Sequence, residues 1–263
     1  HYIKMSNKSI LIKNKDKYVF SIILNCAENG NALNQNLITE LINAFENLSQ
    51  NKLCRVIILE SSSKIFCAGA DLKELKEMQN NSYEKNLKDS KNLMALFKKI
   101  LSIKKLVIAK VNGAAIAGGC GLATACDVIF GTEKAKFGYS EVKIGFVPAL
   151  VSTFLSKRVN DFISKELFLT GEILDSKKAH KINLINYNVK SEKVDKEVEL
   201  YIKRFLKNSS PQSVSETKNM LYNFFEFEKK MNLACEINAR SRKNTDCLLG
   251  IKRFLNKEKN FWN

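Results

Sequence analysis

The sequence is poor in several residue types that would mark particular protein classes. Two prolines and 11 glycines among 263 residues exclude collagen-like and proline-rich disordered chains. With 2 histidines and no CxxC pair, we expect no Cys/His zinc site and predict no metal. The longest weakly polar run, residues 113–126, is shorter than the ~20 apolar residues that a membrane-spanning helix needs. A soluble protein that spans no membrane is therefore expected.

Positive charge is the strongest bias in the composition. The chain has 43 lysines and arginines against 27 acidic residues, which gives a formal net charge of +16. Such an excess would attract nucleic acid, anionic membranes or phosphorylated ligands. The lysines are spread over the whole chain, however, and no basic cluster interleaved with aromatic residues marks an RNA-reading surface. A solvated lysine-rich surface is the simpler interpretation, and no nucleic-acid partner is expected.

The seven cysteines do not suggest a disulfide framework. Their number is odd, and several lie inside apolar runs. Reduced, buried thiols in a reducing compartment fit this pattern best. No charged segment leads into an apolar stretch at the start of the sequence. We therefore expect a cytoplasmic protein, or one of the mitochondrial matrix or another organelle if the source is eukaryotic.

The first part of the chain alternates between strand-like and helical patterns. Helical spacing of apolar residues predicts helices over residues 37–48 and 83–101. Short runs rich in β-branched and aromatic residues predict buried strands at 10–12, 18–24, 56–59, 106–111 and 128–130. Strands that alternate with helices indicate an α/β fold.

The pattern changes near residue 195. From there to the end of the chain the helical period dominates, and no strand-like run occurs. We therefore divide the chain into a core at 6–195 and a helical oligomerisation region at 196–263. Apolar helices without a partner are costly to expose, so association of several copies should cover them.

Two turns of small residues, at 66–72 and 112–121, each follow a buried strand and lead into a helix. Such turns let a ligand approach the backbone and direct unpaired N–H groups at it. There is no GxGxxG motif and no Walker lysine, so neither turn matches a known phosphate site. Two such turns together favour a paired N–H site, such as an oxyanion hole.

The residues of these turns resemble the crotonase, or enoyl-CoA hydratase/isomerase, superfamily. The similarity continues through Asn31-Ala32-Leu33-Asn34, Phe137 to Glu141 with Gly145 and Pro148, Thr170-Gly171-Glu172, and Gly250 to Leu255. It covers nearly the whole chain, from about residue 10 to 262. The resemblance implies a spiral of repeated ββα units with a C-terminal helical trimerisation region. It also implies a homotrimer or a dimer of trimers.

The resemblance further implies an acyl-CoA substrate, of which coenzyme A is a part, so no separate cofactor is expected. The N–H groups of Ala68 and Gly118 match the two donors that bind the thioester oxygen of the substrate. Lys257, placed on the last helix, matches a lysine that reaches a CoA phosphate of a neighbouring subunit. Asp71 is also expected to cap its helix. The residues that match the adenine and pantetheine path are Ala68, Gly69, Ala70, Asp71 and Leu72.

The catalytic carboxylates depart from the family pattern. Enoyl-CoA hydratases typically use two glutamates that hold one water, and Glu141 matches one of them. The other position is Gly121, so the two-carboxylate mechanism is incomplete here. The turn at 25–31 also lacks the Arg-Pro pair and the CoA-contacting lysine of related proteins.

Three functions remain open on this basis. The first is a 2-enoyl-CoA hydratase, and residues 140–149 resemble the methylglutaconyl-CoA hydratase-like branch. The second is a Δ3,Δ2-enoyl-CoA isomerase, which needs one base, and Glu141 could supply it. The third is a family member that binds CoA or RNA without catalysis.

Overall fold

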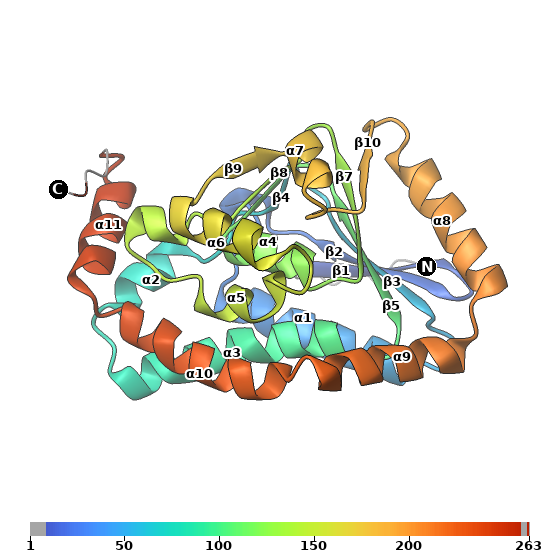
Figure 1. Cartoon of the computed structure of the whole chain (residues 1–263), viewed down its shortest axis with the longest axis horizontal. Helices are drawn as coiled ribbons and strands as arrows, with labels where there is room; N and C mark the ends of the chain where they lie inside the picture. The colour runs from blue at the N-terminus through green and yellow to red at the C-terminus, as the bar shows by residue number, and fades with distance from the viewer. Residues whose placement is uncertain (1–8, 259–261, 263) are drawn as a thin grey trace.

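The computed structural model describes residues 9–258 and 262, and its centre is a pair of β-sheets (Figure 1). The larger sheet has the strand order β1-β2-β3-β5-β7-β10, and the smaller has the order β4-β6-β8-β9. The strands are β1 (Ile10–Asp16), β2 (Val19–Leu24), β3 (Val56–Ser61), β4 (Ile65–Cys67), β5 (Leu106–Val111), β6 (Ala114–Ile116), β7 (Val128–Thr132), β8 (Lys136–Gly138), β9 (Ile173–Asp175) and β10 (Tyr187–Val189).

Helices follow the strands and dominate the C-terminal part. They are α1 (Gln35–Gln50), α2 (Leu72–Met78), α3 (Tyr83–Ser102), α4 (Gly118–Thr124), α5 (Ala149–Leu155), α6 (Asp161–Thr170), α7 (Ser176–Lys181), α8 (Val194–Asn208), α9 (Pro211–Phe224), α10 (Phe227–Ser241) and α11 (Thr245–Leu255). Two short 3₁₀ helices, η1 (Ala27–Asn29) and η2 (Glu141–Ile144), complete the described elements.

Successive units of the chain each add one strand to both sheets. β3, β5 and β7 pair in parallel in the larger sheet, and the strands that directly follow them, β4, β6 and β8, pair in parallel in the smaller one. Helices come after each strand pair, so the chain winds as a spiral. The predicted α/β fold of repeated ββα units with a C-terminal helical region is confirmed.

The central strands β3, β5 and β7 of the larger sheet are buried on both faces, as their apolar sequences predict. Alternate residues of β3 point to opposite sides, so Ile57 packs into the main core with α1 and α3. Its neighbour Ile58 lies in a second cluster, which α8 covers with Val194 and Val198. This arrangement explains why the strand sequence is continuously apolar rather than alternating.

The helices at the C-terminus pack on the same chain. α10 lies along α3 and also contacts α5, while α11 contacts α2 and η2 (Figure 1). Phe227 and Met231 of α10 enter the main core. No helix in the described part of the chain is long and apolar enough to cross a membrane.

All seven cysteines are buried and none forms a disulfide, which confirms the predicted buried thiols. Burial raises the pKa of the Cys67, Cys120 and Cys126 thiols to about 12. These side chains act as small apolar groups of the core.

Candidate active site

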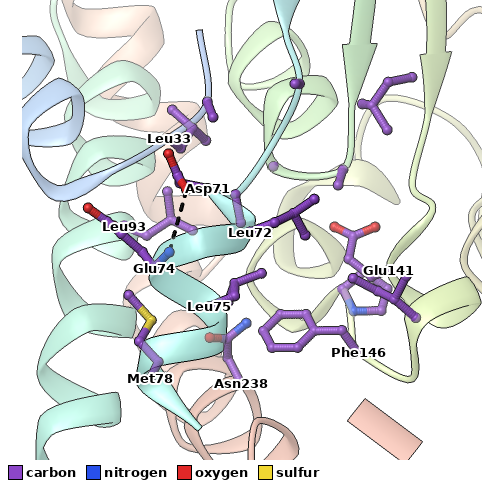
Figure 2. Close-up of a pocket in the computed structure, with 18 of the residues that line it drawn as sticks. Leu33, Asp71, Leu72, Glu74, Leu75, Met78, Leu93, Glu141, Phe146 and Asn238 are labelled. Atoms are coloured by element: carbon purple, nitrogen blue, oxygen red, sulfur yellow. Dashed lines mark hydrogen bonds between the residues drawn. The ribbon is translucent and has the colours of Figure 1, made fainter. Parts of the chain in front are cut away.

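A cavity of about 580 Å³ opens between α2, α3, α10, α11 and the two small-residue turns. Of the residues predicted from the sequence, Ala68, Ala70, Asp71, Leu72, Gly118 and Glu141 line it. Gly69 and Lys257 are not among the lining residues. The fold therefore brings both turns and the candidate catalytic carboxylate to one cavity (Figure 2).

The first turn is tightly packed against the second. Gly69 has a φ of +93°, and a Cβ there would lie 2.8 Å from the carbonyl oxygen of Ile116 and 3.1 Å from Cβ of Ala117. Only glycine fits this conformation and this space. Asp71 then caps α2, as predicted, because its Oδ1 accepts from the N–H of Lys73 at 2.9 Å.

The structure corrects the predicted role of Ala68 as an oxyanion donor. Its N–H donates to the carbonyl of Gly30 at 2.9 Å, so this group is already occupied within the fold. Ala70, two residues further along the turn, also lines the cavity. Its N–H makes no hydrogen bond within the described residues, although Ala70 pairs with Leu33 through a bridge. Ala70 is therefore the N–H donor that the first turn offers.

The second turn presents the N–H of Gly118. Gly118 is the first residue of α4, so its N–H has no acceptor within the helix. The preceding residue, Ala117, has a φ of +52°, which costs a non-glycine residue about 1–3 kcal/mol. Its N–H donates to the carbonyl of Gly138 at 2.7 Å and holds this strained turn in place.

A side chain at Gly118 would extend into the cavity rather than into the protein. The nearest atom to a Cβ at this position is Cδ1 of Leu33, at 3.1 Å, and no backbone atom lies within 4 Å. The next glycine differs, because a Cβ at Gly119 would lie 2.2 Å from the carbonyl oxygen of Cys67. Gly118 thus keeps space for a ligand, and Gly119 lets α4 approach β4.

Glu141 supplies a buried carboxylate at the start of η2, directly after Ser140. Only 8% of the residue is exposed, and its Oε2 has no hydrogen-bond partner among the described residues. Burial raises the pKa of Glu141 to about 7. In Figure 2 the carboxylate lies on the opposite side of the cavity from α3, with Phe146 near it. A carboxyl group with this pKa can both accept and return a proton near neutral pH.

The position of the missing glutamate is filled by apolar side chains. A Cβ at Gly121 would lie 2.3 Å from Cγ1 of Val151 and 3.1 Å from Cζ of Phe97. Phe97 and Val151 both line the cavity. The wall of the cavity beside Gly121 is therefore hydrophobic, and no carboxylate takes the place of the absent one there.

Two other carboxylates of the cavity, those of Asp71 and Asp89, have partners within the protein. Asp71 caps α2, and Asp89 forms an ion pair with Arg242, with Oδ2 2.5 Å from Nη1. Burial, with the nearby carboxylates of Asp71 and Asp89, raises the pKa of Glu74. Among the acidic residues of the cavity, Glu141 combines burial with an oxygen that lacks a partner.

Lys257 does not lie on the last helix, contrary to the sequence prediction. α11 ends at Leu255, and Lys257 follows in a turn with a φ of +56°. The residue is exposed. Its predicted contact with a CoA phosphate of a neighbouring subunit stays a prediction.

Four further lining residues come from the C-terminal part of the chain: Asn238 of α10, Arg242 directly after it, and Phe254 and Leu255 of α11. Phe254 and Leu255 lie in a segment that resembles the family. The only sequence signal of Asn238 and Arg242 was the helical period, which does not show what a helix packs against. Within the described residues, no group of three or more His, Cys, Asp or Glu side chains is placed to hold a metal ion.

Comparison with known proteins agrees with this architecture. The enoyl-CoA hydratase/isomerase family model matches residues 14–263. A protein of Thermus thermophilus is 36% identical over 242 residues, which cover 91% of this chain and 95% of that protein. The mitochondrial enoyl-CoA hydratase of Pongo abelii is 36% identical over 175 residues, or 66% of this chain and 59% of its own.

A solved structure extends the comparison to the fold. The crystal structure of an enoyl-CoA hydratase/isomerase from Xanthobacter autotrophicus Py2 has a TM-score of 0.85 and 28% identity, and it covers 94% of this chain and 93% of its own. Sequence and structure thus agree over nearly the full length, and the chain belongs to the enoyl-CoA hydratase/isomerase family, with the crotonase fold.

Proposed function

We propose that this protein is an enoyl-CoA hydratase that uses Glu141 as its single acid–base residue. The observation that carries the proposal is the buried carboxylate of Glu141, which lacks a partner at Oε2 and shares a cavity with the N–H of Gly118. The thioester oxygen of a 2-enoyl-CoA would accept hydrogen bonds from the N–H groups of Ala70 and Gly118. One such donor lowers the barrier by ~3–4 kcal/mol in comparable sites.

The reaction needs one proton to leave water and one to reach the substrate. Ionised Glu141 takes a proton from water, and the resulting hydroxide forms a bond to the β-carbon. The electrons of the double bond move to the thioester oxygen, where the two N–H groups stabilise the enolate. Protonated Glu141 then returns its proton to the α-carbon. A pKa of about 7 makes both steps accessible at neutral pH.

The apolar wall at Gly121 supports isomerisation as a second candidate function. Phe97 and Val151 give a water molecule no second carboxylate to bind at this position. An isomerase needs no water, because Glu141 would take a proton from C2 of a 3-enoyl-CoA and return it to C4. The double bond then moves from C3–C4 to C2–C3, and the same N–H pair stabilises the enolate.

Association of several copies is part of the proposal. Phe224, Leu233 and Leu248 are large apolar side chains of the C-terminal helices, and they are 71%, 58% and 36% exposed. A homotrimer, or a dimer of trimers, would cover such residues. Light scattering at micromolar concentration should therefore give the mass of a trimer or hexamer, and a monomer would contradict this part of the proposal.

The test is a turnover screen with 2-enoyl-CoA and 3-enoyl-CoA thioesters. A decrease in the enoyl absorbance of crotonyl-CoA would support hydration. An increase in 2-enoyl thioester absorbance when a 3-enoyl-CoA is added would support isomerisation. Binding of acyl-CoA without either reaction would indicate a non-catalytic CoA-binding protein and contradict both. Binding of RNA that falls steeply with salt, without turnover of any thioester, would favour the RNA-binding alternative.

A further inference from the structure

A group of polar side chains lines the cavity where α3 faces α10, and the proposed reaction does not use it. Asp89 of α3, Asn238 of α10 and Arg242, the residue directly after α10, line the cavity, and Ser90 of α3 lies behind them. In Figure 2, Asn238 lies at the lower end of the drawn residues, with Leu75 and Phe146 between it and Glu141. We name these four residues the α3–α10 polar group.

Asn238 is held in one orientation. Its Oδ1 accepts from Ser90 Oγ at 2.7 Å and from Nη2 of Arg242 at 3.1 Å. A guanidinium can only donate, so the atom that it contacts must be the oxygen of the amide. Nδ2 is therefore the remaining atom, and it has no hydrogen-bond partner among the described residues. The nitrogen is drawn on the side of Phe146, toward the interior of the cavity (Figure 2).

This amide nitrogen is a donor without an acceptor among the described residues. Asn238 as a whole is 5% exposed and lines the cavity, so the donor is held at the cavity wall. The fixed position of Oδ1 prevents the side chain from turning Nδ2 elsewhere. A ligand that supplies an acceptor at this point would gain a hydrogen bond from a donor that is already oriented.

The charges around the cavity restrict which acceptor fits. Arg242 lines the cavity and is already paired with Asp89 through Nη1. Five carboxylate side chains and two cationic side chains line the cavity in total: Glu28, Asp71, Glu74, Asp89 and Glu141 against Lys73 and Arg242. An additional carboxylate on a ligand would meet an excess of negative charge. A neutral acceptor meets no such repulsion.

We propose that the α3–α10 polar group binds a hydroxyl group on the acyl chain of the substrate. The hydroxyl oxygen accepts from Nδ2 of Asn238, and its proton is donated to Oδ1 of Asp89, since the ion pair of Asp89 with Arg242 uses Oδ2. Leu75, Met78 and Leu93 line the same cavity and contact the apolar part of the chain. This inference rests on the proposed function, because it assigns an acyl substituent to the substrate of that reaction.

The inference opposes one expectation from the sequence. Methylglutaconyl-CoA carries a free carboxylate at the far end of its acyl group, and the carboxylates of the cavity would repel it. A hydroxylated or unsubstituted acyl chain of the same length should bind more tightly. The resemblance of residues 140–149 to the methylglutaconyl branch therefore does not extend to the acyl end of the cavity.

Binding of saturated acyl-CoA analogues tests the inference without turnover. We would measure Kd by calorimetry for short, medium and long acyl chains that end in a methyl, a hydroxyl or a carboxylate. At the chain length that reaches α10, the hydroxyl compound should bind about tenfold more tightly than the methyl compound. The carboxylate compound should bind most weakly. Equal or weaker binding of the hydroxyl compound at every length, or tightest binding of the carboxylate compound, would overturn the inference.

A pair of variants of α10 assigns the effect to one side chain. Asn238→Leu removes the donor and keeps a similar shape, so the hydroxyl and methyl compounds should bind this variant with about equal Kd. Asn232→Leu makes the same change at an exposed position of the same helix and should keep the wild-type preference. If both variants kept the preference, Asn238 would not be the donor. If Asn238→Leu fails to fold, the Kd values of the wild-type protein for the methyl, hydroxyl and carboxylate compounds still test the inference.

The two proposals fail in different ways. If the wild-type protein turned over no thioester but still bound the hydroxyl compound more tightly than the methyl compound, the proposed reaction would be contradicted and the binding site supported. Turnover without this preference in binding would support the reaction and contradict the binding site.

Discussion

A Cβ built on Gly121 lies 2.3 Å from Cγ1 of Val151, a distance at which two carbon atoms cannot remain. Val151 is 3% exposed and belongs to the main core, so it has little freedom to move away. The side chains of Val151 and Phe97 therefore occupy the space that a glutamate at position 121 would need. The single-carboxylate site is a property of the fold as well as of the sequence.

We expect that Gly121→Glu will not produce a two-carboxylate hydratase. The new side chain would overpack the core and bury a charge, so the free energy of unfolding should fall by at least ~2 kcal/mol. Denaturant unfolding measures this change, and the hydration rate should not rise. Gly121→Glu combined with Val151→Ala opens space and should recover part of the stability. An unchanged midpoint for the single variant would contradict the steric argument.

Glu141→Gln should lower kcat by at least ~100-fold on the best substrate, because the amide keeps the size and loses the basicity. Its midpoint of thermal unfolding should not fall, since the wild-type carboxylate has no partner at Oε2 that the amide would lose. Glu77→Gln, at an exposed position of α2, serves as the control and should keep wild-type turnover. Near-wild-type activity of Glu141→Gln would require another acid–base residue.

The pH dependence of kcat/KM should report the ionisation of Glu141. The base that takes the first proton is the ionised form, and its pKa is about 7. We therefore expect kcat/KM to rise with pH through about 7 and then to level off. A rate that is flat between pH 5 and 8 would show that Glu141 does not act as the base.

Stability should show the opposite trend with pH. The folded-state pKa of Glu141 is about 7 and its ordinary value is 4.5, so the folded chain keeps a proton that the unfolded chain releases. The contribution of Glu141 is fully present below pH 4.5 and is lost as the pH rises through about 7. The loss amounts to about 3 kcal/mol. Unfolding free energies of the wild type minus those of Glu141→Gln, measured across this range, isolate the effect.

Two neighbouring glycines should respond differently to substitution. Gly118→Val should abolish turnover and keep the midpoint of thermal unfolding near wild type, because only a leucine methyl lies near its Cβ. Gly119→Ala should lower that midpoint, since its Cβ would lie 2.2 Å from the carbonyl oxygen of Cys67. Undiminished activity of Gly118→Val would show that the N–H of Gly118 does not bind the thioester oxygen.

The strands β1, β2, β3, β5 and β7 of the larger sheet and the long helices could be predicted from their β-branched or periodic apolar residues. β10 of the same sheet and the strands of the smaller sheet could not, since they are three residues long and lack a continuous β-branched run. β4 overlaps the segment 66–72 and β6 lies within 112–121, and the glycine and alanine residues of these segments conceal the strand pattern.

Family resemblance located the site to within a few residues but could not assign every hydrogen bond. The family pattern points to the N–H of Ala68 as a donor, but in the structure this N–H donates to the carbonyl oxygen of Gly30, 38 positions earlier in the chain. Such long-range pairings depend on how the turns pack. Asn238 was missed for the same reason, because nothing in the sequence shows that α10 lies along α3.

The burial of every cysteine has a practical consequence for spectroscopy. Thiol reagents require an accessible thiolate, and the native chain offers none, since all seven thiols lie inside the protein. A cysteine introduced at Phe162, which is 87% exposed, would be the one thiol at the surface. A fluorescent or spin label could then be attached there without first replacing the native cysteines, and motions of the folded enzyme could be followed by resonance methods.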